Sequence, residues 1–301
     1  MAKERPSLRR AILFVNPRKE CAREAAREIR QRLEGDSVEV TEFLIEERSA
    51  AAPEGEWDLA FSLGGDGTAL FAARALAESA TPILPAHLGR VGFLAGVEMR
   101  EWEAVFQSWL SGEARVSERS MMDVWLEREG RASRLGTCLN DALISSSDGA
   151  RLISLDARSE MPCGAFAELG PYRCDGLIVA TPTGSTAHSM AAGGPVIDPE
   201  MDARVVIPIC PFSLSSRPLV LPASRALYVD VAERRPGAVA LALDGRRALD
   251  LRPGDSVALR DFPRRARLIT SGTGAYYTAL RKKLAWQSGS AAEGAQGGLD
   301  A

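Results

Sequence analysis

Histidine and paired cysteine are scarce in this chain of 301 residues. There are two histidines, His87 and His188, and five cysteines, none of which forms a C-x-x-C pair. These absences exclude a metal cluster of the usual ligand spacing and a disulfide framework. We therefore expect reduced, mostly buried thiols in a cytoplasmic protein.

Long apolar runs and an excess of positive charge are also missing. No run approaches the roughly 20 residues that span a membrane, and the apolar residues 11–15 after the basic start are too few for a signal-peptide core. The net charge of −3 gives no bulk attraction to nucleic acid or to an anionic membrane. The 46% apolar content is enough for two folded cores. We expect a soluble protein of two domains that binds neither nucleic acid nor membrane.

Apolar runs alternate with helix-forming runs over about the first 110 residues. This alternation predicts a Rossmann-like α/β domain with a mostly parallel sheet and right-handed crossovers. In such a sheet ligands collect at the carboxyl ends of the strands. The expected strands are 11–15, 37–45, 58–63 and 82–86, and the expected helices are 18–33, 68–77 and 102–110.

Short strand-like runs separated by turn signals replace this pattern after Gly112. They predict a second domain that is antiparallel and resembles a β-sandwich. A basic amphipathic helix follows at 275–286, and we expect its uncovered apolar face to pack back on the first domain. The predicted division is an α/β domain of 1–116 plus 271–288, a β-rich domain of 117–270, and a disordered tail of 289–301.

The loop Gly64-Gly65-Asp66-Gly67-Thr68 lies between an expected strand and an expected helix. Free backbone N–H groups at such a helix start bind phosphate, and glycines allow close approach of a ligand. A carboxylate would repel phosphate, so Asp66 favours a proton-accepting or metal-organising task. The dinucleotide fingerprint fits poorly because Leu70 replaces its third glycine, and no Gly-Lys pair completes a P-loop. An ordinary strand–helix turn remains an equal alternative.

A second dense segment covers residues 175–195. A strand ends at Thr181-Pro182, and a Thr/Gly/Ser turn leads into a short Ala-rich helix closed by Gly193-Gly194-Pro195. Hydroxyl groups and free amides at a helix start suit a polar small molecule, although a capped helix without a ligand explains them equally. Asn140-Asp141 offers an amide and a carboxylate that suit ribose hydroxyls, or it is a plain turn.

Together these segments resemble the NAD kinase family over about residues 11–286. The matching segments are 64–68, 88–94, 140–141, 175–195, 208–218 and 280–286. The long segment is specific, whereas the Gly-Gly-Asp-Gly loop alone is shared with diacylglycerol and sphingosine kinases and phosphofructokinases. The resemblance implies transfer of the γ-phosphoryl group of ATP, or of polyphosphate, to the adenosine ribose 2′-hydroxyl of NAD, giving NADP. It also implies a divalent cation, Mg²⁺, and a homodimer or homotetramer formed through the β domain.

The resemblance also implies roles for individual residues. Asp66 would be the general base that takes the 2′-hydroxyl proton, and Arg173 would lie near the pyrophosphate. Asp175 and Ala187 would lie near the nicotinamide amide, with Arg151 and Arg246 at the rim of the pocket. The implied donor-phosphate loop is Gly64, Gly65, Gly67 and Thr68. The implied NAD-binding residues are Asp66, Gly67, Asn140, Asp141, Arg151, Arg173, Asp175, Thr186, Ala187, His188, Ser189, Met190, Ala191 and Arg246.

Several positions depart from the family pattern. The departures are His188 for Tyr, Ala191 for Ser, Asp141 for Glu, Phe71 for Arg, His87 for Asn and Phe212 for His. They predict a retained reaction in a reshaped pocket. Two other functions stay open: a lipid or sugar kinase that shares the glycine loop, and a non-catalytic regulator that binds a dinucleotide.

Overall fold

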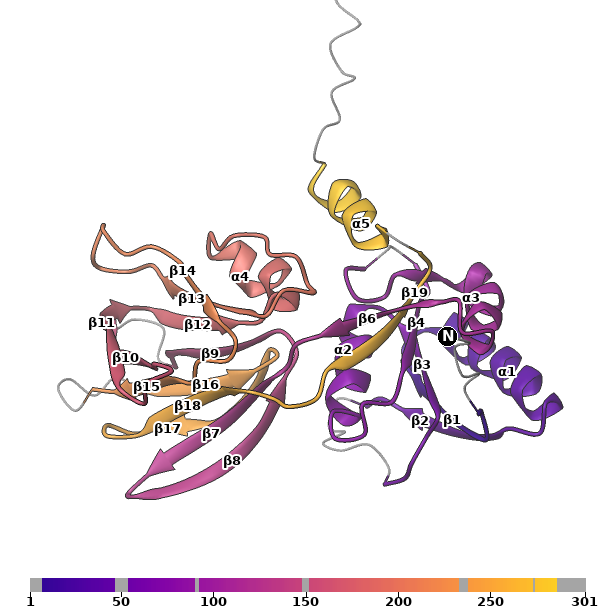
Figure 1. Cartoon of the computed structure of the whole chain (residues 1–301), viewed down its shortest axis with the longest axis horizontal. Coiled ribbons are helices and arrows are strands. Elements are labelled where there is room, and N and C mark those ends of the chain that lie inside the picture. The colour runs from indigo at the N-terminus through magenta and orange to yellow at the C-terminus, as the bar shows by residue number, and fades with distance from the viewer. Residues whose placement is uncertain are drawn as a thin grey trace, which may run out of the picture.

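Two lobes lie side by side in the computed structural model, with helix α5 (Ala275–Leu284) above their junction (Figure 1). The structure describes residues 7–46, 54–89, 92–147, 152–232, 238–272 and 274–285. Arg151 and the predicted tail 289–301 therefore lie outside the described residues.

The first lobe is a mostly parallel sheet with the strand order β2-β1-β3-β4-β19-β6, with β5 paired to β4. Only β6, at the edge, runs antiparallel to its neighbour β19. Its strands are β1 (Arg10–Val15), β2 (Glu39–Leu44), β3 (Leu59–Gly64), β4 (Ile83–His87), β5 (Val97–Glu98), β6 (Arg115–Arg119) and β19 (Ala266–Thr270). Its helices are α1 (Glu20–Gly35), α2 (Asp66–Ala75) and α3 (Trp102–Leu110), the last preceded by a 3-10 turn at Met99–Glu101. The predicted α/β class is confirmed.

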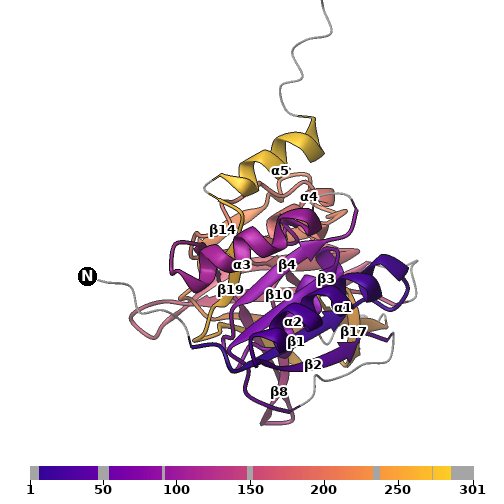
Figure 2. The same ribbon diagram turned by 90° about the vertical axis from the view of Figure 1, so that its right-hand side faces the viewer.

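Helices cover both faces of this sheet, which explains why its central strands are continuously apolar. In β1, Leu13 packs with α1 and α3 on one face, whereas Ile12 and Phe14 pack with α2 on the other. The apolar stripe of α1, which includes Ile29 and Leu33, is buried against the first face. Figure 2 turns this lobe toward the viewer.

Strand β19 differs from the predicted division of the chain. Residues 266–270 were expected in the second domain, but β19 pairs with β4 and β6 and so completes the first sheet. The chain therefore crosses between the lobes twice, after β6 and before β19 (Figure 1).

The second lobe contains two antiparallel six-stranded sheets with the orders β11-β10-β15-β18-β7-β8 and β14-β13-β12-β9-β16-β17. Apolar residues of both sheets, such as Val124, Ile144 and Val179, form one core between them, as the sandwich prediction required. The strands of the first of these sheets are β7 (Met122–Arg128), β8 (Arg131–Cys138), β10 (Ile153–Glu160), β11 (Phe166–Cys174), β15 (Leu227–Val231) and β18 (Ser256–Asp261). Those of the second are β9 (Asp141–Ser146), β12 (Gly176–Ala180), β13 (Ala203–Ile209), β14 (Leu219–Pro222), β16 (Val239–Leu243) and β17 (Arg246–Leu251).

The outer face of β12 and β13 is covered by the segment that follows β12. This segment contains a 3-10 turn at Thr183–Thr186 and the short helix α4 (His188–Ala191). Ile197, further along it, packs with Ile178 and Ile207 of the sheet. The predicted turn and short helix are therefore present.

Two predictions, one about membrane-spanning segments and one about the burial of the thiols, can be compared with the structure. No described helix is long and apolar enough to cross a membrane. The expectation of mostly buried thiols was wrong, because only Cys138 and Cys174 are buried, whereas Cys21, Cys163 and Cys210 are exposed. The exposed three lie on a helix and in loops, where no neighbouring strand covers them.

A buried arginine ties the crossing between the lobes to the sandwich. The guanidinium of Arg204 donates hydrogen bonds to Asp261 Oδ1 at 2.7 Å and to the carbonyl of Met121 at 2.8 Å. Its side chain is 3% exposed, and burial lowers the pKa of Arg204 even though Asp261 opposes that shift. Asp261 therefore supplies the charge that makes the buried cation tolerable.

Asp261→Asn should destabilise the protein by about 3 kcal/mol, because it leaves the cation of Arg204 buried without a counter-charge. The matched control is Asp250→Asn, which breaks the exposed Arg247–Asp250 pair and should change stability by less than about 1 kcal/mol. Urea unfolding of both variants measures the difference. Equal losses in the two would contradict the role given to burial.

Candidate functional site

The glycine loop positions Asp66 as the first residue of α2. The helix begins two residues earlier than predicted, and the amide N–H groups of Thr68 and Ala69 bond the carbonyl of Gly65 at 3.0 and 3.1 Å. A Cβ on Gly64 would lie 2.1 Å from Thr68 Oγ1, so this close packing of loop on helix requires glycine.

The Asp66 carboxylate is held by the loop that follows β4. Its Oδ2 accepts the N–H of Phe93 at 2.9 Å, and its Oδ1 accepts the N–H groups of Leu94 and Ala95, both at 3.0 Å. The side chain remains 34% exposed, and Lys283 Nζ of α5 lies 3.4 Å from Oδ2. The carboxylate is thus fixed in orientation while part of it stays accessible.

Two opposing effects act on the pKa of Asp66. Burial raises the pKa, but the N–H groups of Ala95, Phe93 and Leu94 and the charge of Lys283 outweigh burial, so the pKa lies below its ordinary value. The group is therefore ionised, and able to accept a proton, at neutral pH.

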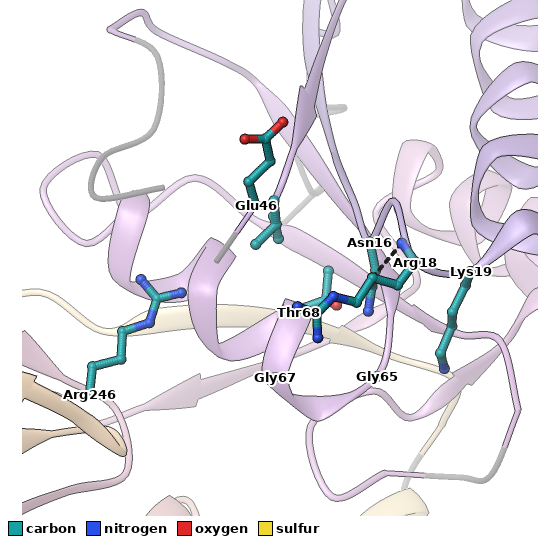
Figure 3. A pocket seen from close by; sticks show the side chains of 9 residues that line it. Asn16, Arg18, Lys19, Glu46, Gly65, Gly67, Thr68 and Arg246 are labelled. Carbon is teal, nitrogen blue, oxygen red and sulfur yellow. Dashed lines mark hydrogen bonds between the residues drawn. The ribbon is translucent and has the colours of Figure 1, made fainter. Parts of the chain in front are cut away.

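A cationic cavity of about 300 Å³ lies at the carboxyl ends of β1, β2 and β3 (Figure 3). Gly65, Gly67 and Thr68 line it from the loop, and Arg246 reaches it from the second lobe. Asn16, Arg18, Lys19, Ile45 and Glu46 complete the lining. Amides at a helix start and three basic side chains are the groups that bind polyanions such as phosphates. Sequence reasoning missed Arg18 and Lys19, because basic residues at the start of the expected helix 18–33 gave no sign of a partner across the sheet edge.

The second lobe contributes the loop of Asn140 and Asp141, and Asp244 orders it. Asp244 Oδ1 accepts the N–H groups of Asn140 at 2.8 Å and Asp141 at 3.1 Å, and Oδ2 accepts that of Leu139 at 3.0 Å. Arg74 of α2 lies 3.6 Å from the same carboxylate, which joins the loop to the first lobe. Sequence reasoning missed Asp244, because an Asp-Gly pair between strand-like runs is an ordinary turn signal.

The segment 183–191 lies beside this loop. A Cβ on Gly184 would lie 2.0 Å from the carbonyl oxygen of Asn140, so the glycine permits their close approach. His188 Nδ1 lies 3.4 Å from Asp141 Oδ1, and burial raises the pKa of Asp141, with His188 opposing that shift. The structure thus brings together the predicted residues Asn140, Asp141 and His188.

The remaining members of this segment differ in accessibility. His188 and Ala191 are exposed, and Thr186, Ala187 and Met190 are half-buried. Ser189 is fully buried, and its hydroxyl points away from solvent without a hydrogen-bond partner among the described residues.

Two predicted residues do not join this cluster, and one lies outside the described residues. Arg173 and Asp175 lie before β12, at the end opposite Ala180, and Asp175 is roughly 17 Å from Ala180 along the strand. Arg173 lies over the ring of Phe212 at 4.7 Å. Arg246 lies over the ring of Phe71 at 5.3 Å and lines the cationic cavity, and a Cβ on the neighbouring Gly245 would lie 4.0 Å from the ring of His188. Arg151 lies outside the described residues.

Comparisons with known proteins agree with this arrangement. Residues 6–114 match the ATP-NAD kinase N-terminal domain, and residues 139–271 match the ATP-NAD kinase C-terminal domain. The NAD kinase of Treponema denticola is 39% identical over 235 residues, 78% of this chain and 81% of that protein. That of Symbiobacterium thermophilum is 39% identical over 284 residues, 90% of this chain and 97% of that protein.

Two solved structures share the fold. Yeast NADH kinase complexed with NADH superposes with a TM-score of 0.83 and 25% identity, covering 93% of this chain and 88% of that one. An NAD kinase from Archaeoglobus fulgidus in complex with ATP gives a TM-score of 0.70 at 24% identity, covering 91% and 98%.

Gly92→Ala should displace the carboxylate of Asp66, because a Cβ there would lie 1.7 Å from Asp66 Oδ1. Without the amide N–H groups, the pKa of Asp66 should rise toward its ordinary value, and carbon-13 NMR titration of the carboxyl group measures that change. Gly96→Ala is the matched control in the same loop, since nothing lies within 4 Å of its added Cβ. A pKa of Asp66 unchanged by Gly92→Ala would refute this description of the site.

Asp244 should give stability a pH dependence. Burial raises its pKa to about 6, although the three N–H groups and Arg74 oppose that shift. The folded protein therefore binds the extra proton between about pH 4 and 6, so stability falls as pH rises through that range and is level above it.

Relative to Asp244→Asn, the wild type should lose up to about 1.4 kcal/mol per pH unit in this window. Urea unfolding at several pH values measures the gap between the two proteins. A gap that does not change between pH 4 and 6 would contradict the prediction.

Proposed function

The chain belongs to the NAD kinase family, and we propose that it phosphorylates the adenosine ribose 2′-hydroxyl of NAD with Asp66 as general base. The observation that carries the proposal is the ionised carboxylate held at a helix start, beside a cavity lined by amides and basic side chains. The match to both halves of the family disfavours a lipid or sugar kinase that shares only the glycine loop.

The donor side of the proposal rests on the cationic cavity. Its amides at Gly65 and Gly67 and its cations Lys19 and Arg246 suit the phosphates of ATP. Polyphosphate offers the same charges without a nucleoside, so both remain candidate donors. We assign this cavity to the donor and the 2′-hydroxyl to the side of Asp66 that stays exposed.

The acceptor side rests on the second lobe. Helix α2 carries Asp66 at its start and contacts the Asp244 turn through Arg74 near its end. The loop of Asn140 and Asp141, held by Asp244, therefore lies at the junction between the lobes. We propose that Asn140, Asp141 and the exposed face of His188 bind the nucleoside, and that the half-buried Thr186 and Ala187 line its pocket.

We propose that the divalent cation, Mg²⁺, binds together with the phosphates of the donor. The described residues contain no group of three or more His, Cys, Asp and Glu side chains that could hold a metal. Mg²⁺ commonly binds through substrate phosphates, several waters and one or two carboxylates, and Glu46 is the carboxylate that lines the donor cavity. When bound, the cation would neutralise charge on the transferred phosphoryl group.

We further propose a cytoplasmic homodimer or homotetramer that associates through the sandwich. Large apolar side chains are exposed there, with Phe212 at 66% and Leu214 at 92%. Arg173 and Asp175 lie near Phe212 and apart from the Asp141 cluster of the same chain. In such an assembly they would contact the dinucleotide that a neighbouring copy of the chain binds. Light scattering measures the mass of the assembly.

For one chain, we propose an α/β domain of residues 7–119 plus 266–285 and a β-rich domain of residues 120–265.

Asp66→Asn should lower the rate of NADP formation from NAD and ATP by about 10²–10⁴-fold, because it removes the proton acceptor. A coupled NADP assay measures the rate with ATP and with polyphosphate, which also decides the donor. Asp250→Asn, on the exposed face of the sandwich, is the control and should keep the wild-type rate.

Unchanged turnover by Asp66→Asn would remove Asp66 from the mechanism. Tight NAD binding by the wild type with no turnover on either donor would instead favour a non-catalytic regulator.

A further inference from the structure

Helix α5 brings a positive charge from the far end of the chain to the reacting carboxylate. Lys283 Nζ lies 3.4 Å from Asp66 Oδ2, and it also lies over the ring of Phe93 at 4.3 Å. Phe93 is the residue whose N–H bonds the same Oδ2. One ammonium group therefore contacts both the carboxylate and the loop that holds it.

Packing, rather than this ion pair alone, fixes the position of α5. Ala279 and Leu280 are buried, and the ring of Tyr276 contacts that of Phe93 at 6.3 Å. At the other end, the hydroxyls of Tyr276 and Tyr277 donate to the carbonyl of Ile197 and the carboxylate of Asp198 in the second lobe. The helix thus contacts both lobes, and this packing places Lys283 beside Asp66.

The direction of Lys283 distinguishes it from its basic neighbours. Arg281, Lys282 and Lys283 all occupy the last turn, where positive charge complements the helix dipole. That general effect explains their charge but gives none of them a particular partner. Lys282 lines a separate cavity with His87 and Glu98, whereas Lys283 alone of the three contacts Asp66.

The two oxygens of Asp66 are held by different kinds of donor. Oδ1 accepts the amide hydrogens of Leu94 and Ala95, whereas Oδ2 accepts the amide hydrogen of Phe93 and a hydrogen of the Lys283 ammonium group. The contact from Lys283 falls on Oδ2. A cation there restricts the rotation of the carboxylate, so its removal would leave Oδ2 with a single fixed donor, the N–H of Phe93.

Building on the proposed role of Asp66, we propose that Lys283 is a positioning residue that holds Oδ2 in the orientation needed to accept the proton of the sugar hydroxyl. Misplacement of a reacting group by about 1 Å lowers rates by as much as about 10²-fold. Loss of Lys283 should therefore act on turnover and leave ground-state binding of the dinucleotide largely intact.

The test compares Lys283→Met, Lys283→Arg and Lys282→Met in steady-state assays with NAD, ATP and Mg²⁺. We expect Lys283→Met to lower kcat by roughly tenfold or more while KM for NAD changes by less than about twofold. Lys283→Arg, which keeps a cation at this position, should recover most of kcat. Lys282→Met, one residue away on the same helix, should behave as the wild type.

A double mutant separates positioning from direct contact with the phosphates. If Lys283 acts through Asp66, adding Lys283→Met to Asp66→Asn should lower the residual rate no further. A wild-type kcat in Lys283→Met, equal losses in Lys283→Met and Lys282→Met, or a further loss in the double mutant would each overturn the inference. Thermal melting of the variants checks that each is folded.

These outcomes are distinct from failure of the proposed function. If the wild type forms NADP and Asp66→Asn does not, a fully active Lys283→Met sinks only the role of Lys283. If Asp66→Asn keeps its activity, the general-base assignment fails first.

Discussion

Three backbone N–H groups and one carboxylate form the interaction on which the proposed site depends. Asp66 stands at the start of α2, where its own helix leaves N–H groups free for an anion, yet its side chain turns to the amides of Phe93, Leu94 and Ala95. The carboxylate is thereby removed from the cavity lined by Gly65 and Gly67. This separation answers the electrostatic objection to an acidic residue in a phosphate-binding loop.

The sheet order explains why these two loops meet. Strands β3 and β4 are parallel neighbours, so the loops after them emerge at the same edge. Gly92 lets the second loop close on the carboxylate, and α5 covers both through Lys283. The second lobe contacts the other end of α2 through Asp244 and Arg74, and its Arg246 reaches the cavity at the start of the helix.

Much of this was predictable from the sequence, and the failures have physical reasons. The central strands and helix α1 were predicted because burial on two faces or on one face leaves a clear pattern of apolar residues. Strand β19 was missed because only its pairing with β4 and β6, which lie far away in the chain, identifies its five residues as part of the first sheet. Asp66 could be singled out because its charge conflicts with its setting. Asp244 and Lys283 could not, because an Asp-Gly turn and a basic helix end are ordinary until their partners are known.

The most direct test of the central claim is a crystal structure of the protein with NAD and a non-hydrolysable ATP analogue. The account predicts Asp66 Oδ2 within about 2.6–3.2 Å of the adenosine ribose 2′-oxygen. It also predicts the terminal phosphate of the analogue in the cavity of Gly65, Gly67 and Thr68. A dinucleotide bound elsewhere, with Asp66 directed away from the sugar, would contradict it.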